Sequence, residues 1–193
     1  MVGCSKPLAG PRWSPDETKI LAICNNSLVI VDVEASDWQT LLQSSDTLLL
    51  AAGWTADSQS ITAVAEETGQ LVSSPLDIFE IDAASRAIGG HAVSPTNTQW
   101  VIGSASMSPD GRWALVQGND TYAIETATGT ATNLPWIVLP NPFDLATVAW
   151  LRSGNSFLYA NSGKLYEVDL SAMTRTEVGA IPTSNFAWHE SQP

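Results

Sequence analysis

The segment Ser108-Pro109-Asp110-Gly111, followed by Arg112-Trp113 and the apolar run Ala114-Leu115-Val116, decides the fold. In this turn the Ser hydroxyl can bond the backbone, Pro presets φ, Asp suits the third position and Gly accepts a positive φ at the exit. Such a turn closes a tight hairpin between two antiparallel strands. The sequence therefore predicts a β-hairpin here, and similar segments extend the prediction along the chain.

The position of Met107, directly before this turn, recurs through the chain and is otherwise a tryptophan. We call these positions anchors; the others are Trp13, Trp54, Trp150 and Trp188, and consecutive anchors are 41, 53, 43 and 38 residues apart. The turns at 14–17 and 55–58 keep part of the Ser-Pro-Asp-Gly chemistry, whereas 151–154 departs from it. We interpret the anchor tryptophans as wedges between neighbouring sheets, because an aromatic ring buries a large area.

Three more strands in each unit are predicted in phase with the anchors. The second strand begins seven residues after each anchor, at 20–23, 61–64, 114–117 and 157–160. The third strand ends in an acid whose predicted role is turn hydrogen bonding: Asp32, Asp82, Glu125 and Asp169. A weaker fourth strand follows at 39–42, 86–88, 131–134 and 175–178.

Four strands in each unit of about 40 residues predict β-propeller blades. The W-S-P-D-G type of turn, the apolar strand after it and the I-x-x-D type of strand resemble the TolB-like, WD-repeat-like propeller repeat. That repeat is common in bacterial periplasmic and secreted proteins, and it also builds the propeller that gates prolyl-oligopeptidase-type proteases. The resemblance covers residues 8–188 and is specific for fold rather than for function.

We therefore expect an all-β, antiparallel β-propeller with four blade-like repeats and the first strand of a fifth. Residues 1–7 are expected to form an N-terminal tail, and residues 8–193 a single propeller domain. The predicted repeats span about 8–45, 46–90, 101–135 and 144–180, with a fragment at 184–193. Closed propellers of this kind usually have more blades, so we predict a truncated piece, an unusually small ring, or a homo-oligomer that completes the ring.

The charge of the chain restricts its partners. It carries 8 basic and 20 acidic side chains, with a formal net charge of −12. Such an acidic protein repels polyanions, so we expect no nucleic-acid partner and no attraction to anionic lipid surfaces. No apolar run approaches the length of a transmembrane segment. The remaining partners are an unidentified protein or a small-molecule ligand, cationic or neutral in character.

The two cysteines carry different expectations. Cys24 lies in the apolar run 20–24, where a buried, inert thiol is predicted. Cys4 follows Met1-Val2-Gly3, which resembles the lipobox of bacterial lipoproteins and makes Cys4 a hypothetical lipidation site. We expect the protein in the bacterial periplasm or at the cell surface, or in the cytoplasm if Met1 is the true start.

Every excess in loop length falls on one face of the predicted propeller. This long-loop face carries the insertion 66–75 and the connections between blades 2 and 3 and between blades 3 and 4. Binding sites tend to occupy such loops on a rigid scaffold. The hypothetical ligand- or partner-binding residues are Trp100, Trp136, Phe143, Asp144 and His91. The alternative is that Trp136 and Phe143 only cap the sheets.

The sequence contains no motif typical of a catalytic, metal-binding or cofactor-binding site. His91 and His189 are the only histidines, neither has metal-ligand spacing, and no G-x-S-x-G or phosphate-binding loop occurs. We predict no catalytic residue, no metal and no cofactor. The expected function is a non-catalytic propeller scaffold that binds a protein or small ligand in the bacterial cell envelope. The alternatives are the gating propeller of a larger prolyl-oligopeptidase-like hydrolase, and a glycan-binding module.

Overall fold

The computed structural model describes residues 9–67, 76–93, 104–118, 120–137 and 148–180. In these ranges the chain forms four antiparallel sheets, each of four strands in sequence order. They contain no helix, and therefore none long and apolar enough to cross a membrane. The predicted all-β fold with four blade-like sheets is confirmed. The fifth-blade fragment at 184–193 lies outside the described residues.

We number the sheets as blades 1 to 4 in chain order. Blade 1 contains β1 (Ala9–Trp13), β2 (Lys19–Cys24), β3 (Ser27–Asp32) and β4 (Asp37–Gln43), and blade 2 contains β5 (Thr47–Trp54), β6 (Ser60–Glu67), β7 (Leu76–Asp82) and β8 (Ile88–Val93). Blade 3 contains β9 (Ser104–Met107), β10 (Trp113–Gln117), β11 (Thr121–Glu125) and β12 (Thr130–Asn133), and blade 4 contains β13 (Val148–Trp150), β14 (Ser156–Asn161), β15 (Lys164–Asp169) and β16 (Thr174–Ala180).

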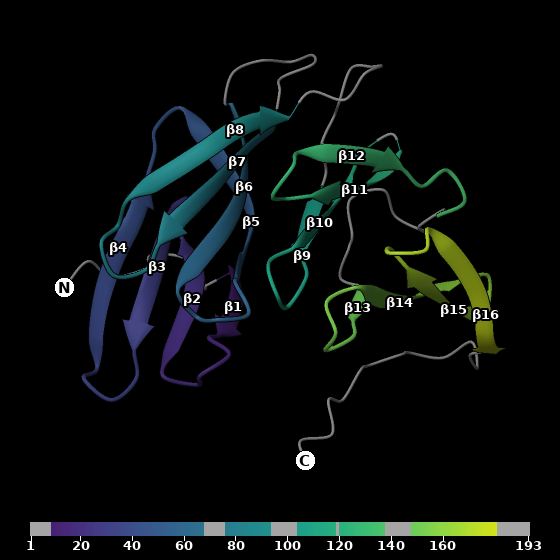
Figure 1. Cartoon of the computed structure of the whole chain (residues 1–193), viewed down its shortest axis with the longest axis horizontal. Coiled ribbons are helices and arrows are strands. Elements are labelled where there is room, and N and C mark those ends of the chain that lie inside the picture. The colour runs from purple at the N-terminus through teal and green to yellow at the C-terminus, as the bar shows by residue number, and fades with distance from the viewer. Residues whose placement is uncertain (1–8, 68–75, 94–103, 119, 138–147, 181–193) are drawn as a thin grey trace.

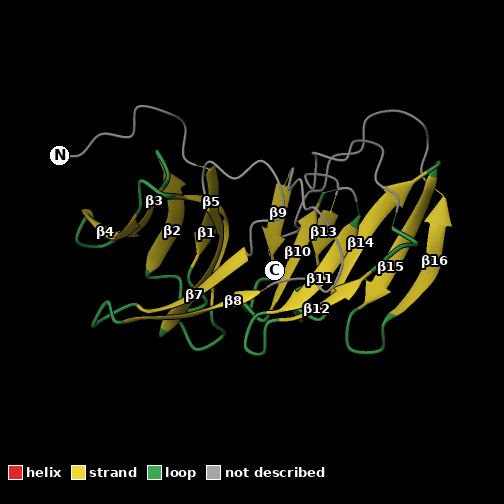
Figure 2. Cartoon of the chain, turned by 90° about the horizontal axis from the view of Figure 1, so that it is seen from above, coloured by secondary structure: helices red, strands yellow, loops and turns green. Residues whose placement is uncertain are grey.

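The four blades form an arc around a shared centre (Figure 1). The first strands β1, β5, β9 and β13 lie toward that centre, and the fourth strands lie at the periphery. The turns that join first to second strands and third to fourth strands gather along one edge of the sheets, the lower edge in Figure 2. We call this edge the short-turn face. The opposite edge is the long-loop face.

The core lies between consecutive blades, because residues alternate between the two faces of each strand. Leu21 and Ile30 of blade 1 pack with Ile61 and Ile81 of blade 2. The opposite face of blade 2 packs against blade 3, and the far face of blade 3 packs against blade 4. Each inner blade is therefore buried on both faces.

The anchors connect each blade to the one before it. Trp54 is 1% exposed, and its Nε1 donates to the Arg12 carbonyl oxygen of blade 1 at 3.3 Å. Trp150 makes a similar contact between blades 3 and 4, donating from Nε1 to Ser106 Oγ at 2.9 Å. Met107 is fully buried between blades 2 and 3. The predicted wedge is confirmed for these anchors.

Trp13 is an exception, since its side chain is 56% exposed. Its prediction as a wedge is wrong in the described part of the chain. Trp13 stands in the first blade, and no described blade precedes it to cover the ring.

The Ser-Pro-Asp-Gly turn is held by a short network. Ser108 Oγ accepts from the Trp113 backbone N–H at 2.9 Å and donates to Asp110 Oδ1 at 2.6 Å. Oδ1 also accepts from the Arg112 backbone N–H at 3.1 Å. The turns that begin at Ser14 and Thr55 repeat this pattern. The fourth turn residue has a positive φ in every blade: Glu17 (60°), Ser58 (62°), Gly111 (70°) and Gly154 (72°).

The acids that end the third strands act in the turns that follow, as predicted. Asp32 Oδ1 accepts from the Ala35 backbone N–H at 2.8 Å, and Asp82 and Asp169 make equivalent bonds. Glu125 instead accepts from Thr128 Oγ1 at 3.1 Å and pairs with Arg112. Four residues after each acid, φ is again positive.

Two details differ from the predictions. The fourth strand of blade 2, expected at 86–88, is β8 (Ile88–Val93), because Arg86 holds the preceding turn with φ of 62°. Cys24 is buried as expected but is disulfide-bonded rather than a free thiol. The only other cysteine in the chain is Cys4, which lies outside the described residues.

Candidate functional site

Most of the predicted binding residues fall outside the described part of the chain. Trp100, Phe143 and Asp144 belong to segments that the structure does not describe, as do residues 68–75 of the predicted insertion 66–75, whose first two residues lie in β6. His91 was expected in the connection between blades 2 and 3, but its backbone lies in β8, paired with Ile78. Trp136 is the one predicted side chain that can be examined in detail.

Trp136 is half-buried at the boundary between blades 3 and 4, where it packs against the core. Its carbonyl oxygen accepts from the Arg175 guanidinium at 2.8 Å, and that guanidinium lies 5.7 Å from the centre of the indole ring. Arg175 also lies over Tyr166 at 4.7 Å and donates to Tyr159 Oη at 3.1 Å. Burial raises the pKa of Tyr159, against the lowering effect of Arg175. Trp136 thus joins a cation–π cluster that caps the two blades.

Three polar side chains lie at the long-loop end of blade 3. Gln117 ends β10 and pairs across the sheet with Ser104 and with Thr121. Directly opposite residues share a face of the sheet, and this face looks toward blade 4. Gln117 is 4% exposed and Thr121 2% exposed. Ser104 Oγ, Gln117 Oε1 and Thr121 Oγ1 are buried without a hydrogen-bond partner among the described residues. We call these three residues the blade-3 polar group.

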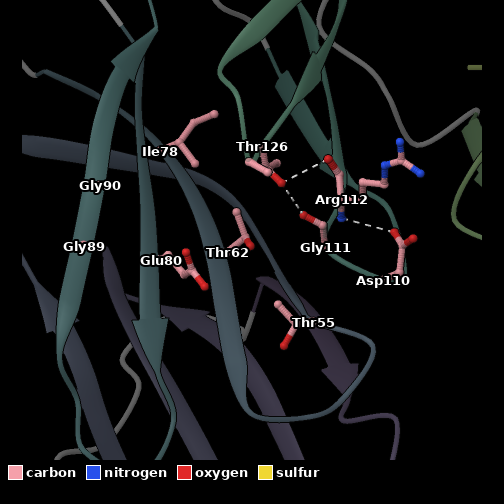
Figure 3. A pocket seen from close by; sticks show the side chains of 11 residues that line it. Thr55, Thr62, Ile78, Glu80, Gly89, Gly90, Asp110, Gly111, Arg112 and Thr126 are labelled. Carbon is pink, nitrogen blue, oxygen red and sulfur yellow. Dashed lines mark hydrogen bonds between the residues drawn. The ribbon is translucent and has the colours of Figure 1, made fainter. Parts of the chain in front are cut away.

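A cleft of about 320 Å³ opens between blades 2 and 3 on the short-turn face (Figure 3). Blade 2 contributes Thr62 from β6, Glu80 from β7 and Gly89 from β8 to its walls. Blade 3 contributes the Asp110–Arg112 turn and Thr126. Thr126 Oγ1 stabilises this wall by donating to the carbonyl oxygens of Gly111 at 2.8 Å and Arg112 at 3.0 Å.

Acidic residues, threonines and one arginine line the cleft. Arg112 lies 3.1 Å from Glu125 Oε1, so its charge is already paired. Asp110 Oδ1 is engaged in its own turn. Glu80 is exposed and has no hydrogen bond or ion pair with any described residue. The walls are therefore net acidic.

Sequence reasoning placed binding on the long-loop face and missed this cleft. The available signal was in the repeats themselves: Thr62 stands where blades 1 and 3 have Leu21 and Leu115. A polar residue at a repeated core position departs from the pattern of the other units.

Comparisons with known proteins address the fold. A scan against protein-family models finds no match, and a search of curated proteins finds no relative. Among solved structures, the chain is similar to TolB from Acinetobacter baumannii, with 17% identity and a TM-score of 0.57 over 90% of this chain. It is also similar to Porphyromonas gingivalis dipeptidyl peptidase 4, with 12% identity and a TM-score of 0.58 over 90% of this chain.

A third similar structure is the Cps50 (Swd1) beta-propeller domain from Myceliophteria thermophila, with 11% identity and a TM-score of 0.55 over 95% of this chain. The chain spans 44% of the TolB chain, 32% of the peptidase chain and 60% of the Cps50 chain. At these identities the likeness concerns fold alone. The chain has the blade architecture of TolB-like, WD-repeat-like β-propellers, as predicted.

Proposed function

We propose that this protein is a non-catalytic propeller scaffold that binds a partner protein or a small ligand on its long-loop face. The observation that carries the proposal is the blade-3 polar group. Buried polar atoms in native proteins nearly always have a hydrogen-bond partner, and three neighbouring ones without a partner among the described residues favour an interaction with another molecule.

The positions at which the strands end also favour binding on the long-loop face. β6 ends at Glu67 and β7 begins at Leu76, β8 ends at Val93 and β9 begins at Ser104, and β12 ends at Asn133 and β13 begins at Val148. These three longest connections all start and finish on the long-loop face. The hypothetical binding residues Trp100, Phe143 and Asp144 belong to two of them. Trp136, held by Arg175, follows β12 in the third of these connections and would supply a fixed aromatic side chain.

Site-specific photo-crosslinking tests this proposal. A photoreactive residue replaces Asp120, which is exposed on the long-loop face, and in a matched variant it replaces Asp37, which is exposed on the short-turn face. After incubation with a bacterial envelope extract, we expect a discrete crosslinked partner from position 120 and none from position 37. The same product from both positions, or from position 37 alone, would contradict the proposal.

A second variant separates binding from packing. Gln117→Met keeps the side-chain volume and removes the unpartnered Oε1. We expect it to fold with unchanged or increased thermal stability, because an unsatisfied buried polar group is itself costly. The crosslink from position 120 should be lost. A destabilised Gln117→Met variant with an intact crosslink would assign Gln117 a structural role instead.

We also propose a location in the bacterial cell envelope. The disulfide at Cys24 supports it, since disulfides persist in oxidising compartments. Cys4, as the only other cysteine, is the candidate partner, and a sulfur in a disulfide cannot also carry a lipid. Intact mass spectrometry without reductant distinguishes the two. Loss of two thiol hydrogens supports the disulfide, and a diacylglyceryl adduct on Cys4 supports lipidation.

The likeness to dipeptidyl peptidase 4 favours a second candidate function. The chain matches 32% of that enzyme, so it could be the propeller part of a larger hydrolase. The complete gene tests this idea. An α/β-hydrolase domain encoded in the same reading frame would support the second candidate, and its absence would remove it.

A further inference from the structure

Blades 1 and 3 follow one rule at the position that faces the next blade. In blade 1, Leu21 of β2 pairs with Ile30 of β3, and both are buried against blade 2. In blade 3, Leu115 of β10 pairs with Ala123 of β11, and both are buried against blade 4. This repeated position is therefore an apolar contact between consecutive blades.

Blade 2 breaks the rule at the same position. Thr62 of β6 pairs with Glu80 of β7, and Glu80 pairs in turn with Gly89 of β8. The pair faces blade 3, since Val64 and Ile78 on the same side belong to the core between these blades. Two polar residues and a glycine thus replace the apolar contact, and the cleft opens at this point.

Thr62 gives the cleft a buried polar group. Its side chain is 5% exposed and has no hydrogen bond to any described residue. Figure 3 shows it between Glu80 and the Gly111 turn, inside the cleft. Because Thr62 lines the cleft, its hydroxyl is available to hydrogen-bond a group that enters there.

Gly89 keeps the cleft open. A Cβ added there would meet only the Glu80 carbonyl oxygen, at 4.0 Å. The backbone at Gly89 therefore tolerates a side chain. A larger residue would fill the cleft without disturbing the blade.

The charge of the walls indicates the kind of ligand. Glu80 supplies a carboxylate, and Arg112 is paired with Glu125. The Asp110 carboxylate lies against Gly154 of blade 4, away from blade 2. Ile78 adds an apolar surface that can contact a short hydrocarbon stem. A phosphate or carboxylate ligand would be repelled, whereas a cation gains charge-assisted hydrogen bonds. The net charge of −12 also attracts cations to the protein.

We propose that this cleft binds a primary ammonium group on a short aliphatic chain, provided either by a free alkylamine or by a lysine side chain. The ammonium group donates to Thr62 Oγ1 and to the Glu80 carboxylate, and its stem packs on Ile78. The proposal is independent of the function proposed above, because it concerns the opposite face.

Two-dimensional amide NMR tests the ligand class and its source. The ¹⁵N-labelled chain is titrated with 1,5-diaminopentane, and separately with a capped peptide that contains one lysine. We expect saturable shifts of the Gly89, Gly111 and Thr126 amides with at least one of them, and the stronger of the two identifies the source. The neutral 1,5-pentanediol and the acetyl-lysine peptide should leave these amides unchanged. Absence of shifts with both amines would overturn the proposal.

Substitutions locate the binding. Gly89→Leu should abolish the shifts, while Gly179→Leu, in an outer strand where an added Cβ meets nothing within 4 Å, should leave the affinity unchanged. Thr62→Val and Glu80→Gln should each weaken binding roughly ten-fold, the expected loss for a hydrogen bond to a charged group. Unchanged affinity in a folded Gly89→Leu variant would refute the assignment. Because Glu80 is exposed, its variant remains informative if Thr62→Val does not fold.

The same variants separate this proposal from the previous one. Gly89→Leu should keep the crosslink from position 120, and Gln117→Met should keep the amine-induced shifts. Either proposal can therefore fail while the other stands.

Discussion

Trp13 and Trp54 occupy the same position in two successive blades and have opposite environments. Trp54 is 1% exposed and bonds to the backbone of the preceding blade, whereas Trp13 is 56% exposed. The local sequence around the two residues is similar, so the repeat does not determine their burial. Their burial is determined by whether a described blade precedes them and covers the ring. Among the described residues, blade 1 is an edge blade, and blades 2 and 3 are inner blades.

The fourth residue of the first-to-second-strand turn also differs between blades 1 and 3. Gly111, in an inner blade, has a positive φ, and its Cα lies so close to blade 2 that an added Cβ would meet the Trp54 carbonyl oxygen at 2.7 Å. Glu17, in the edge blade, has a similar φ but an exposed side chain. The same backbone conformation thus requires glycine in one blade and accepts glutamate in another.

Removal of the anchors should show the largest difference. We expect Trp54→Ala to lower the free energy of unfolding by about 3–5 kcal/mol, because it leaves a large cavity in the core. Trp13→Ala should cost about 1 kcal/mol or less, as for other surface positions. Urea denaturation followed by circular dichroism measures both. Equal losses would mean that Trp13 is covered in solution, and the edge blade would then have a neighbour.

A methyl group at the inner turn should have the next largest effect. Gly111→Ala forces a Cβ into the left-handed region, which costs about 1–2 kcal/mol, and adds a collision with Trp54. Glu17→Ala, at the matched position of blade 1, serves as the control, since the exposed Glu17 already adopts a φ of 60°. A stability loss in Gly111→Ala no greater than in Glu17→Ala would show that the blade contact is unimportant.

The opposite change in the edge blade should be mildly favourable. Glu17→Gly removes the penalty of a left-handed non-glycine residue, at some entropic cost in the unfolded chain. We expect a gain of up to about 1 kcal/mol in unfolding free energy. Thermal unfolding under identical conditions provides the measurement. Destabilisation would show that the Glu17 side chain contributes more than its strain costs.

The smallest expected effect is electrostatic. Hydrogen bonds from Thr55 and the Gln59 backbone lower the pKa of Asp57 below 3.8, and Asp16 is lowered similarly by Ser14 and Thr18. Because the folded pKa lies below the unfolded value, the stabilisation is present above about pH 4 and is lost as the pH falls through the folded pKa. Asp57→Asn should flatten the fall in melting temperature between about pH 4 and 2. An unaltered profile would exclude this residue from the acid response.

Much of the fold was predictable because the sequence repeats its local chemistry. The turn at 108–111 and the acid at Asp169 act through neighbours within five residues, so their roles follow from short stretches of sequence. The second and third strands followed for the same reason. The fourth strand of blade 2 was misplaced because Arg86 adopts a left-handed turn conformation and Gly89-Gly90 gives little strand signal.

The candidate sites were harder to predict because they depend on contacts between blades. Trp136 could be selected as an aromatic residue in a long connection, but its capping by Arg175 joins residues 39 apart in sequence. The cleft needs Thr62 and Gly111, which share no local pattern. The disulfide of Cys24 also could not be derived, since an apolar run predicts burial and not oxidation.

The anchor tryptophans that bond to a neighbouring blade both contact the blade that precedes them in the chain. Trp54 bonds to blade 1 and Trp150 to blade 3, so each new blade finds its docking surface in the part of the chain that was synthesised before it. A nascent chain leaves the ribosome in that same order, and its N-terminal parts fold first. Translation would therefore bring Trp54 and Trp150 each to a blade that has already been synthesised.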